Sequence, residues 1–350
     1  MARKNSAAVL HGINDLRIEP VDIVEPNDNE VLLKMASVGI CGSDVHYLVH
    51  GRIGDFVVDR PMIIGHESSG TVIQRGKNVK HLNVGDRVAI EPGVPCRTCE
   101  FCKSGHYNLC QEIQFCATPP VHGSLRKFYT HAADFCYKLP DHVSLEEGAL
   151  LEPLSVGVHA CKRAEVGIGS NLLILGSGPV GLVTLVAAKC MGAKKVAIAD
   201  LMEYRLDLAR KLKADVVYPI VNTNTEQENV DNISKLMECQ PDITIDASGA
   251  ESSIRLAIRI TKAGGKVVLV GMGKPEMNIP LGDALVKELD IRGVFRYVND
   301  YSDALDLVST KNINLGTIVT HRYKFEETSQ AFDTAKSTHS GAIKVIINLD

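Results

Sequence analysis

The pattern of apolar and polar residues along the chain changes near residue 144. Before that point, short apolar runs alternate with turns rich in glycine, proline and charge, as in Glu30–Val38, Gly70–Ile73 and Arg87–Ile90. Short runs with this punctuation are typical of β-strands joined by turns. We therefore expect residues 5 to about 150 to form a mainly β domain.

A helical pattern begins at Ser144. Ser144 and Glu147 have the spacing of a capping box, and apolar residues follow at Leu150, Leu151 and Val156. A capping box ahead of a periodic apolar stretch marks the start of a helix. One or two helices are expected here, joining the mainly β domain to the next one.

Strands and helices then alternate along the chain. The expected strands are Asn171–Leu175, Lys195–Ala199, Asp242–Asp246 and Lys266–Val270, and the expected helices are Val180–Met191, Glu203–Ala214 and Glu251–Thr261. This alternation predicts an α/β domain with a doubly wound parallel sheet. The pattern is less regular from Asp290, and the last apolar run, Ala342–Asn348, predicts a closing strand.

Length and charge narrow the class of protein. A chain of 350 residues has room for two domains. Its formal net charge of −4 gives no sign of the basic surface that binds nucleic acid or anionic membranes. The uncharged segment Leu172–Ala188 is interrupted by Gly176 and Pro179, so we interpret it as a strand, a turn and a helix rather than a membrane span. With no export signal in its first residues, a cytoplasmic, reducing environment is expected.

A dinucleotide-binding motif, Gly176-Ser-Gly-Pro-Val-Gly181, follows an expected strand and opens an expected helix. Gly176 permits a tight turn, Gly178 lets the backbone approach a pyrophosphate, and Gly181 allows close packing of helix and strand. The N-terminus of the helix offers N–H groups to the phosphates. In this strand–turn–helix context the motif predicts a dinucleotide site.

The choice of dinucleotide depends on Asp200, at the end of the second strand of the alternating segment. A carboxylate there accepts hydrogen bonds from the adenosine ribose and repels a 2′-phosphate, which favours NAD over NADP. Two alternatives stay open. Asp200 can instead cap the following helix, and Arg205 can accommodate a phosphate.

Four cysteines lie close together, at Cys96, Cys99, Cys102 and Cys110. Four thiolates make the closed tetrahedral site of a structural zinc ion, which holds a loop through its binding free energy. The alternative of four free thiols is unattractive, because clustered exposed thiols oxidise. A structural zinc site is expected here.

A second metal site is inferred from two separate motifs. Cys41 lies in Gly-Ile-Cys-Gly-Ser-Asp-Val-His, and His66 and Glu67 directly follow Gly65. A catalytic zinc takes three protein ligands and keeps one position open. Alone, a core cysteine and a surface histidine would be the ordinary interpretation, but together with the dinucleotide motif these residues predict a catalytic zinc.

These motifs resemble those of the zinc-containing medium-chain dehydrogenases. The resemblance rests on residues 41–47 and 65–67, the four cysteines and the glycine motif. Longer stretches at 115–129, 135–161 and 293–297 are similar to the polyol (sorbitol-type) branch of that family.

The resemblance implies a GroES-like catalytic domain formed by residues 1–153 and 291–350, with a Rossmann NAD-binding domain at 154–290 between them. It implies a catalytic zinc on Cys41, His66 and Glu67, with Glu152 close to the metal. The implied reaction is oxidation of a polyol such as sorbitol or xylitol to the ketose with NAD, in a cytoplasmic homotetramer.

Residues that match the family's motifs have implied contacts. Those implied to contact the substrate are Tyr47, Glu152, Arg296 and Tyr297. Those implied to contact NAD, beside the glycines, are Pro179, Val180, Asp200, Arg205, Val270, Gly271, Met272, Val294, Phe295 and Arg296.

One departure concerns the four cysteines. Mammalian-type sorbitol dehydrogenases mostly lack them, so this chain looks like a two-zinc member, similar in that respect to some insect and microbial polyol dehydrogenases. Some of those use NADP, and Asp200 is the residue that favours NAD here.

Ser43 and His46 are expected to be catalytic, because their hydroxyl and imidazole can pass the alcohol proton to solvent. Alternatively Glu152 or a zinc-bound water takes the proton, while Ser43 caps a helix and His46 packs.

For the whole chain, two rival functions remain. One is another medium-chain activity, such as a threonine or aryl-alcohol dehydrogenase, and the other is nucleotide binding without catalysis.

Overall fold

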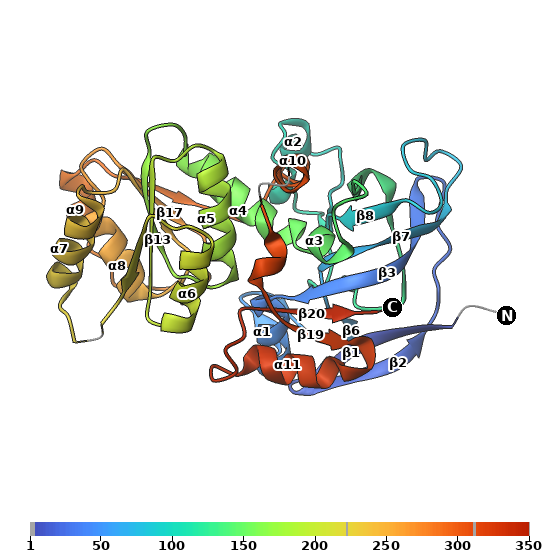
Figure 1. The fold of residues 1–350 in the computed structure, drawn as a ribbon. Coiled ribbons are helices and arrows are strands. Elements are labelled where there is room, and N and C mark those ends of the chain that lie inside the picture. The colour runs from blue at the N-terminus through green and yellow to red at the C-terminus, as the bar shows by residue number, and fades with distance from the viewer. Residues whose placement is uncertain (1–3, 222, 311–312, 350) are drawn as a thin grey trace. The chain divides into compact units, whose positions relative to one another are not determined.

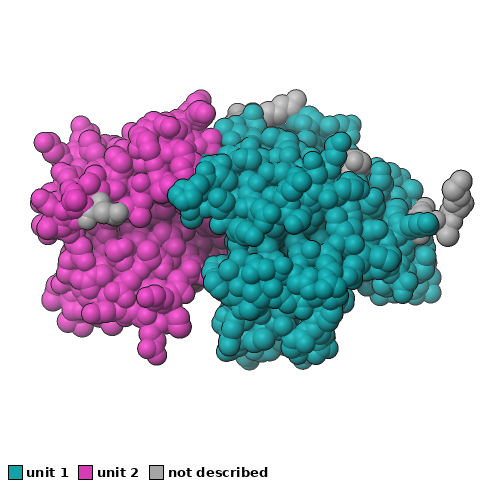
Figure 2. All heavy atoms as spheres, turned by 90° about the horizontal axis from the view of Figure 1, so that it is seen from below, with its two compact units in different colours: residues 1–152, 304–350 teal, residues 153–303 magenta. Residues whose placement is uncertain are grey.

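A computed structural model describes residues 4–221, 223–310 and 313–349 (Figure 1). Contacts divide the chain into two compact units, shown in different colours in Figure 2. The first unit comprises residues 1–152 and 304–350, and the second comprises residues 153–303.

The first unit is mainly β, as its punctuated apolar runs predict. Its largest sheet has seven strands, in the order β12-β8-β7-β3-β20-β19, with β11 paired to β3. These strands are β3 (Glu30–Ile40), β7 (Glu67–Arg75), β8 (Arg87–Ile90), β11 (Phe128–Ala132), β12 (Cys136–Lys138), β19 (Val319–Lys324) and β20 (Lys344–Asn348). Buried side chains such as Leu33, Ile90 and Ile347 form its core.

Smaller elements complete the first unit. A three-stranded sheet contains β1 (Asn5–Gly12), β2 (Asp15–Val21) and β6 (Met62–Ile63). Two further pairs are β4 (Arg52–Ile53) with β5 (Phe56–Val57), and β9 (Gly93–Val94) with β10 (Gln114–Phe115). The helices are α1 (Gly42–His50), α2 (Glu100–Lys103), α3 (Leu145–Ala149) and α11 (Thr328–Lys336), with short 3-10 turns η1 (Tyr107–Leu109), η2 (Ala133–Phe135), η3 (Leu315–Ile318) and η4 (Phe325–Glu327).

The expected capping box opens α3. Ser144 Oγ accepts a hydrogen bond from the Glu147 N–H at 3.2 Å, and the Glu147 carboxylate accepts one from the Ser144 N–H at 2.9 Å. Helix α4 (Leu151–Ala164) follows directly, so two helices lie where one or two were expected.

The second unit is a Rossmann fold. Its six strands are parallel, in the order β15-β14-β13-β16-β17-β18, and the order reverses between β13 and β16. They are β13 (Asn171–Leu175), β14 (Lys195–Asp200), β15 (Val216–Pro219), β16 (Ile243–Asp246), β17 (Lys266–Leu269) and β18 (Asp290–Gly293). The four expected strands are confirmed to within one residue, whereas β15, which ends in a proline, and β18, which is mostly polar, lack a clear apolar run and are not among the expected strands.

Helices complete the second unit. They are α5 (Pro179–Cys190), α6 (Glu203–Lys211), α7 (Glu226–Met237), α8 (Glu251–Ile260) and α9 (Leu281–Val286), together with most of α4. The expected helix 203–214 ends three residues early, since Lys213 adopts a left-handed φ of 63°. A further helix, α10 (Tyr301–Ser309), carries the chain back into the first unit.

The second crossing between the units differs from the expected domain boundary at residue 290. Residues 290–293 form β18, which pairs with β17, so the parallel sheet continues past that boundary. The compact unit extends to Asp303. Among residues 4–221, 223–310 and 313–349, no helix combines the length and apolar character needed to cross a bilayer.

Candidate functional site

Two neighbouring strands of the first unit bring three candidate metal ligands together. Cys41 directly follows β3, while His66 precedes β7 and Glu67 opens it. Glu67 pairs with Gly39 of β3, because antiparallel neighbours place the end of one strand beside the start of the next. One ligand atom from each of Cys41, His66 and Glu67 lies within 4.8 Å of the others.

The space for the Glu67 carboxylate depends on a glycine. A Cβ atom at residue 39 would lie 2.1 Å from Glu67 Oε2. Any other residue at position 39 would therefore displace the carboxylate from this cluster. Gly39 keeps the surface of β3 open beneath it.

A buried carboxylate in α1 links the segments that carry the ligands. Asp44 accepts hydrogen bonds from the N–H groups of Cys41 and Gly65, both at 3.1 Å, and its Oδ1 lies 3.6 Å from His66 Nδ1. Burial lowers the pKa of His66, but the facing charge of Asp44 outweighs it and holds that pKa well above its usual value. A carboxylate behind a histidine orients the ring toward a metal.

A buried lysine also belongs to this cluster. Lys344 opens β20, is 2% exposed, and places Nζ 2.6 Å from both carboxylate oxygens of Glu67. Burial lowers the pKa of Lys344, but the negative charges of Glu67, Cys41 and Glu152 outweigh it and raise that pKa. The one sign of this residue in the sequence is that a lysine interrupts the apolar run 342–348. That run predicts a strand but gives no role to Lys344.

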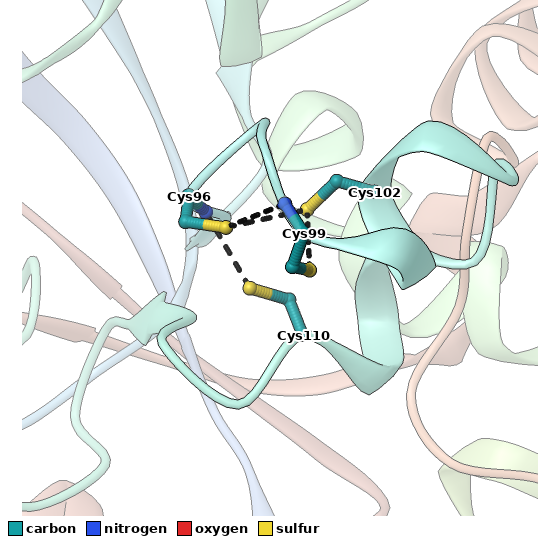
Figure 3. Close-up of side chains that lie close together, drawn as sticks. All are labelled: Cys96, Cys99, Cys102 and Cys110. Carbon is teal, nitrogen blue, oxygen red and sulfur yellow. Dashed lines mark hydrogen bonds between the residues drawn. The ribbon is translucent and has the colours of Figure 1, made fainter.

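The other candidate ligands lie in one loop of the first unit. Sulfur atoms of Cys96, Cys99, Cys102 and Cys110 point toward one another and lie within 4.8 Å (Figure 3). Cys99 Sγ is 3.5 Å from Cys102 Sγ, and Cys96 Sγ is 3.9 Å from it. Sulfur atoms around a tetrahedral zinc with 2.3 Å bonds are about 3.8 Å apart, so the donor set and its spacing fit zinc.

Charge also favours a cation at the four cysteines. Hydrogen bonds from Thr98 and from backbone N–H groups lower the pKa of Cys96 to about 6. Burial and the neighbouring thiols raise the pKa of Cys102 to about 12. The protein alone therefore favours a thiolate at Cys96 and disfavours one at Cys102. A bound divalent cation would favour the thiolate form of all four cysteines, because it offsets the repulsion between their negative charges.

The remaining candidate residues of the first unit lie on two helices. On α1, Ser43 is half-buried, His46 is exposed and Tyr47 is 3% exposed. Glu152 is in the first turn of α4 and is 6% exposed. A buried carboxylate and a buried phenol can order a polar ligand, whereas the exposed imidazole can exchange protons with water.

In the second unit, the three motif glycines have the expected geometry. Gly176 has φ of 99°, a Cβ at Gly178 would meet only Arg205 Nη1 at 3.8 Å, and a Cβ at Gly181 would lie 1.8 Å from the Gly176 carbonyl oxygen. The turn thus needs glycine at its first and last positions and leaves open space at the middle one. Helix α5 starts there, with Pro179 at its first position and Val180 next.

Asp200 lies beside this turn at the end of β14. It accepts hydrogen bonds from the N–H groups of Ser177 at 2.6 Å and Met202 at 2.8 Å, and Arg205 Nη1 lies 3.9 Å away. A cavity of about 360 Å³ opens at this end of the sheet. Its lining includes Gly176, Asp200, Arg205, Ile220 and Leu256.

Two loops carry the other candidate residues of the second unit. Val270, Gly271 and Met272 follow β17, and a Cβ at Gly271 would lie 2.1 Å from the Gly249 nitrogen. The loop after β18 carries Val294, Phe295, Arg296 and Tyr297, of which Tyr297 is 2% exposed. Arg296 lies with its guanidinium 4.7 Å from the ring centroid of Phe295.

Comparison with known proteins places the chain in a family. Residues 27–141 match the alcohol dehydrogenase GroES-like domain, and residues 179–310 match the zinc-binding dehydrogenase domain. Chicken (Gallus gallus) sorbitol dehydrogenase is 52% identical over 99% of this chain and 97% of its own, and the human enzyme is 50% identical over 99% and 96%.

Solved structures agree with the fold. An Escherichia coli oxidoreductase of unknown specificity has a TM-score of 0.93 and 36% identity, covering 99% of this chain and 100% of its own. Escherichia coli L-idonate 5-dehydrogenase has a TM-score of 0.90 and 29% identity, covering 99% of both chains. The chain therefore belongs to the zinc-binding alcohol dehydrogenase family, with a GroES-like and a Rossmann domain. Within it, full-length similarity groups the chain with the sorbitol dehydrogenases.

Proposed function

We propose that the protein is an NAD-dependent polyol dehydrogenase that oxidises sorbitol or xylitol to the ketose. The observation that carries this proposal is the cluster of Cys41, His66 and Glu67, whose ligand atoms lie within 4.8 Å of one another in a chain half identical to sorbitol dehydrogenases. A recruited scaffold without activity need not keep such a cluster. We propose the first unit as the catalytic domain and the second as the NAD-binding domain.

We propose two zinc ions per chain. Cys41, His66 and Glu67 would hold the catalytic ion, and Cys96, Cys99, Cys102 and Cys110 the structural one. Bound at the first cluster, zinc supplies Lewis acidity that lowers a hydroxyl pKa by about eight units, or about 11 kcal/mol, and NAD supplies the hydride acceptor. Asp44 orients His66, and Lys344 holds Glu67 and offsets its charge.

The cofactor would bind to the second unit. The N–H groups at the start of α5 would bind the pyrophosphate, and the cavity beside Asp200 would take the adenosine. Asp200 already accepts from two backbone N–H groups, and its remaining lone pairs could accept from the ribose hydroxyls. A 2′-phosphate would meet this carboxylate, so NAD is the proposed cofactor. Val270–Met272 and Val294–Arg296 would contact the rest of it.

A polyol needs hydrogen-bonding groups rather than an apolar slot. Tyr47, Glu152, Arg296 and Tyr297 supply hydroxyl, carboxylate and guanidinium groups for that purpose, and such sites discriminate strongly against analogues that lack a hydroxyl. Ser43 and the exposed His46 would pass the proton to solvent, with Glu152 as the alternative acceptor. His46→Ala should then slow oxidation, with partial recovery at high pH.

Steady-state kinetics test the proposal directly. Sorbitol, xylitol, threonine and benzyl alcohol are compared, each with NAD and with NADP. We expect the highest kcat/KM for a polyol with NAD. Preference for threonine or benzyl alcohol would assign another activity of the family, and no turnover by metal-loaded protein would leave nucleotide binding alone.

The proposed assembly is a homotetramer in the cytoplasm. In the second unit, α9 exposes Leu285 at 78% and Val286 at 79%, and β18 lies at the edge of the parallel sheet. Exposed apolar side chains and a strand at a sheet edge are both features that support self-association. Light scattering of the purified protein measures the mass, and a monomer at micromolar concentration would contradict this part.

A further inference from the structure

The loop between β18 and α10 has an uncommon backbone. Arg296 has φ of 56° and Asn299 has φ of 55°. Residues other than glycine rarely adopt this left-handed region, and they keep it where the surrounding structure over-determines it. We therefore expect contacts with the surrounding structure to fix the conformation of this loop, which carries the proposed substrate residues Arg296 and Tyr297.

Asp300 is the residue that ends this loop. It has no exposed surface, and its Oδ2 accepts a hydrogen bond from the N–H of Val298 at 2.9 Å. The carboxylate thus bends back over the loop and spans Asn299. Next to it, Tyr301 is 1% exposed and packs its ring 5.5 Å from that of Tyr297.

Helix α4 holds the Asp300 carboxylate from the other side. His159 Nδ1 lies 2.9 Å from Asp300 Oδ2, and Lys162 Nζ lies 2.7 Å from Oδ1. Burial raises the pKa of Asp300, but the contacts with His159 and Lys162 outweigh it and leave that pKa below its usual value. A buried carboxylate without such partners would be strongly unfavourable, so the three residues form one unit.

The other end of the loop is tied to the same helix. Arg163 Nε donates to the carbonyl oxygen of Gly293 at 3.4 Å, and Arg292 Nη1 donates to the carbonyl oxygen of Arg163 at 2.8 Å. Both ends of residues 293–300 are thus attached to the last turns of α4. All of these residues lie in the second unit.

We propose that Asp300, clamped by His159 and Lys162, is a positioning residue that sets where Arg296 and Tyr297 meet the polyol. It contacts no reacting group and acts through the loop. This inference rests on the proposed function, since it takes Arg296 and Tyr297 as substrate residues.

The test compares Asp300→Asn with Asp303→Asn. Both aspartates lie within 2.7 Å of Lys162 Nζ, but Asp303 is half-exposed and follows Tyr301 rather than ending the loop. Asp300→Asn should raise KM for sorbitol about tenfold, the size of a coupling between contacting residues, with kcat within about threefold. Asp303→Asn should leave KM within about twofold, as for an exposed ion pair.

A double-mutant cycle separates positioning from general damage. In an Arg296→Ala background, Asp300→Asn should change KM by less than about twofold, because the residue that it positions is gone. An equal rise of KM in both backgrounds, or a fall in kcat alone, would overturn the positioning role. Arg296→Ala without any effect on KM would instead refute the proposed substrate site, and this inference with it.

If Asp300→Asn fails to fold, substitutions at His159 provide a second test of the positioning role. His159→Leu removes a partner of Asp300 and should raise KM for sorbitol. His159→Gln keeps a donor and should recover most of the loss. If both variants raise KM equally, the contact with Asp300 is not what matters, and the proposal is wrong.

Discussion

The two metal-ligand clusters of the first unit are assembled in different ways. All four cysteines of one cluster lie in residues 96–110, and its geometry is a property of one loop. In the other, Cys41 and the pair His66–Glu67 come from separate strands, and the buried charges of Asp44 and Lys344 surround them. Under the proposal above, the four-cysteine cluster would depend on a cation to hold its loop together, whereas the cluster of Cys41, His66 and Glu67 is held by the sheet and by the ion pair with Lys344.

The difference predicts different consequences of metal loss. Four thiolates in a short loop repel one another, and a bound cation would offset that repulsion. Glu67, by contrast, has Lys344 as a partner within the protein itself. Loss of an ion from the four cysteines should lower the stability of the protein. Loss of an ion from Cys41, His66 and Glu67 should lower its activity.

The largest expected effect is on activity. Cys41→Ser should lower kcat/KM for sorbitol by about 10³-fold or more, equal to about 4 kcal/mol of barrier, because it weakens the Lewis-acid site. Zinc analysis should show about one ion per chain instead of two, with the unfolding midpoint little changed. Cys190→Ser, at an exposed cysteine, is the matched control. Full activity after proven loss of this zinc would end the Lewis-acid account.

The next effect is on stability. Cys99→Ser should lower the free energy of unfolding by about 4 kcal/mol and the midpoint by about 10 °C, because the loop loses its cross-link. Thermal denaturation followed by circular dichroism measures it. Protein that stays folded should keep its kcat within about threefold. An unchanged midpoint would mean that the four cysteines bind no structural ion.

The ion pair between Lys344 and Glu67 predicts a smaller effect, on the free energy of unfolding, which depends on whether zinc is bound. Lys344→Met leaves the Glu67 carboxylate buried without a partner, which should cost about 3 kcal/mol in metal-free protein. Excess zinc should recover most of that loss, since the ion then faces the carboxylate. Denaturant unfolding with and without zinc measures both values. Lys77→Met, which breaks an exposed pair with Asp28, should change neither value by more than about 0.5 kcal/mol. Equal destabilisation with and without zinc would contradict this view of the cluster.

The last effect is similar in size but appears only on acidification, and it concerns a buried histidine that is not a candidate metal ligand. His131 on β11 is 4% exposed, and burial lowers its pKa from 6.5 to about 4. Its Nε2 donates to the carbonyl oxygen of Glu91 at 2.8 Å, and its Nδ1 lies 3.0 Å from the Tyr129 hydroxyl. The neutral ring is the form that the fold stabilises.

The sign follows from the lowered pKa. The contribution of His131 is complete above pH 6.5 and is lost as the pH falls toward 4, amounting to about 3 kcal/mol. Denaturant unfolding from pH 7 to 4 measures it. His131→Gln should reduce the slope of the unfolding free energy against pH by an amount that corresponds to close to one proton taken up on unfolding. His339→Gln, at an exposed histidine, should leave the slope unchanged. An identical slope in His131→Gln would show that His131 already titrates normally.

Much of the fold follows from local pattern. The strands at 171–175 and 195–199 each have four consecutive apolar residues after one polar residue and are bounded by glycine or charge, so their positions can be predicted to within a residue. The glycine motif and the cysteine spacing are equally local. The strands β15 and β18 escape prediction because they lack a clear apolar run, and a strand of that kind takes its structure from the sheet it joins. Helix α7 is largely polar, and the capping box of Thr225 and Glu228 is the local signal that could have predicted it.

The candidate site divides in the same way. Cys41, His66, Glu67 and the four cysteines can be proposed as ligands from the sequence, because metal chemistry restricts the residue types and resemblance supplies their grouping. The roles of Asp44, Lys344 and Asp300 cannot, since aspartates and lysines are common and mostly exposed. What distinguishes these three is burial opposite a particular partner.

The sequence by itself determined which residues are candidates to bind metal and dinucleotide, and the four central strands and the main helices of the α/β unit. Only the tertiary structure decided that β3, β7 and β20 lie side by side, which pairs Lys344 with Glu67 across 277 residues of chain. It also decided that Asp300 meets His159 and Lys162. Such pairings depend on which strands and helices pack together, and a pattern of neighbouring residues carries no information about a partner far along the chain.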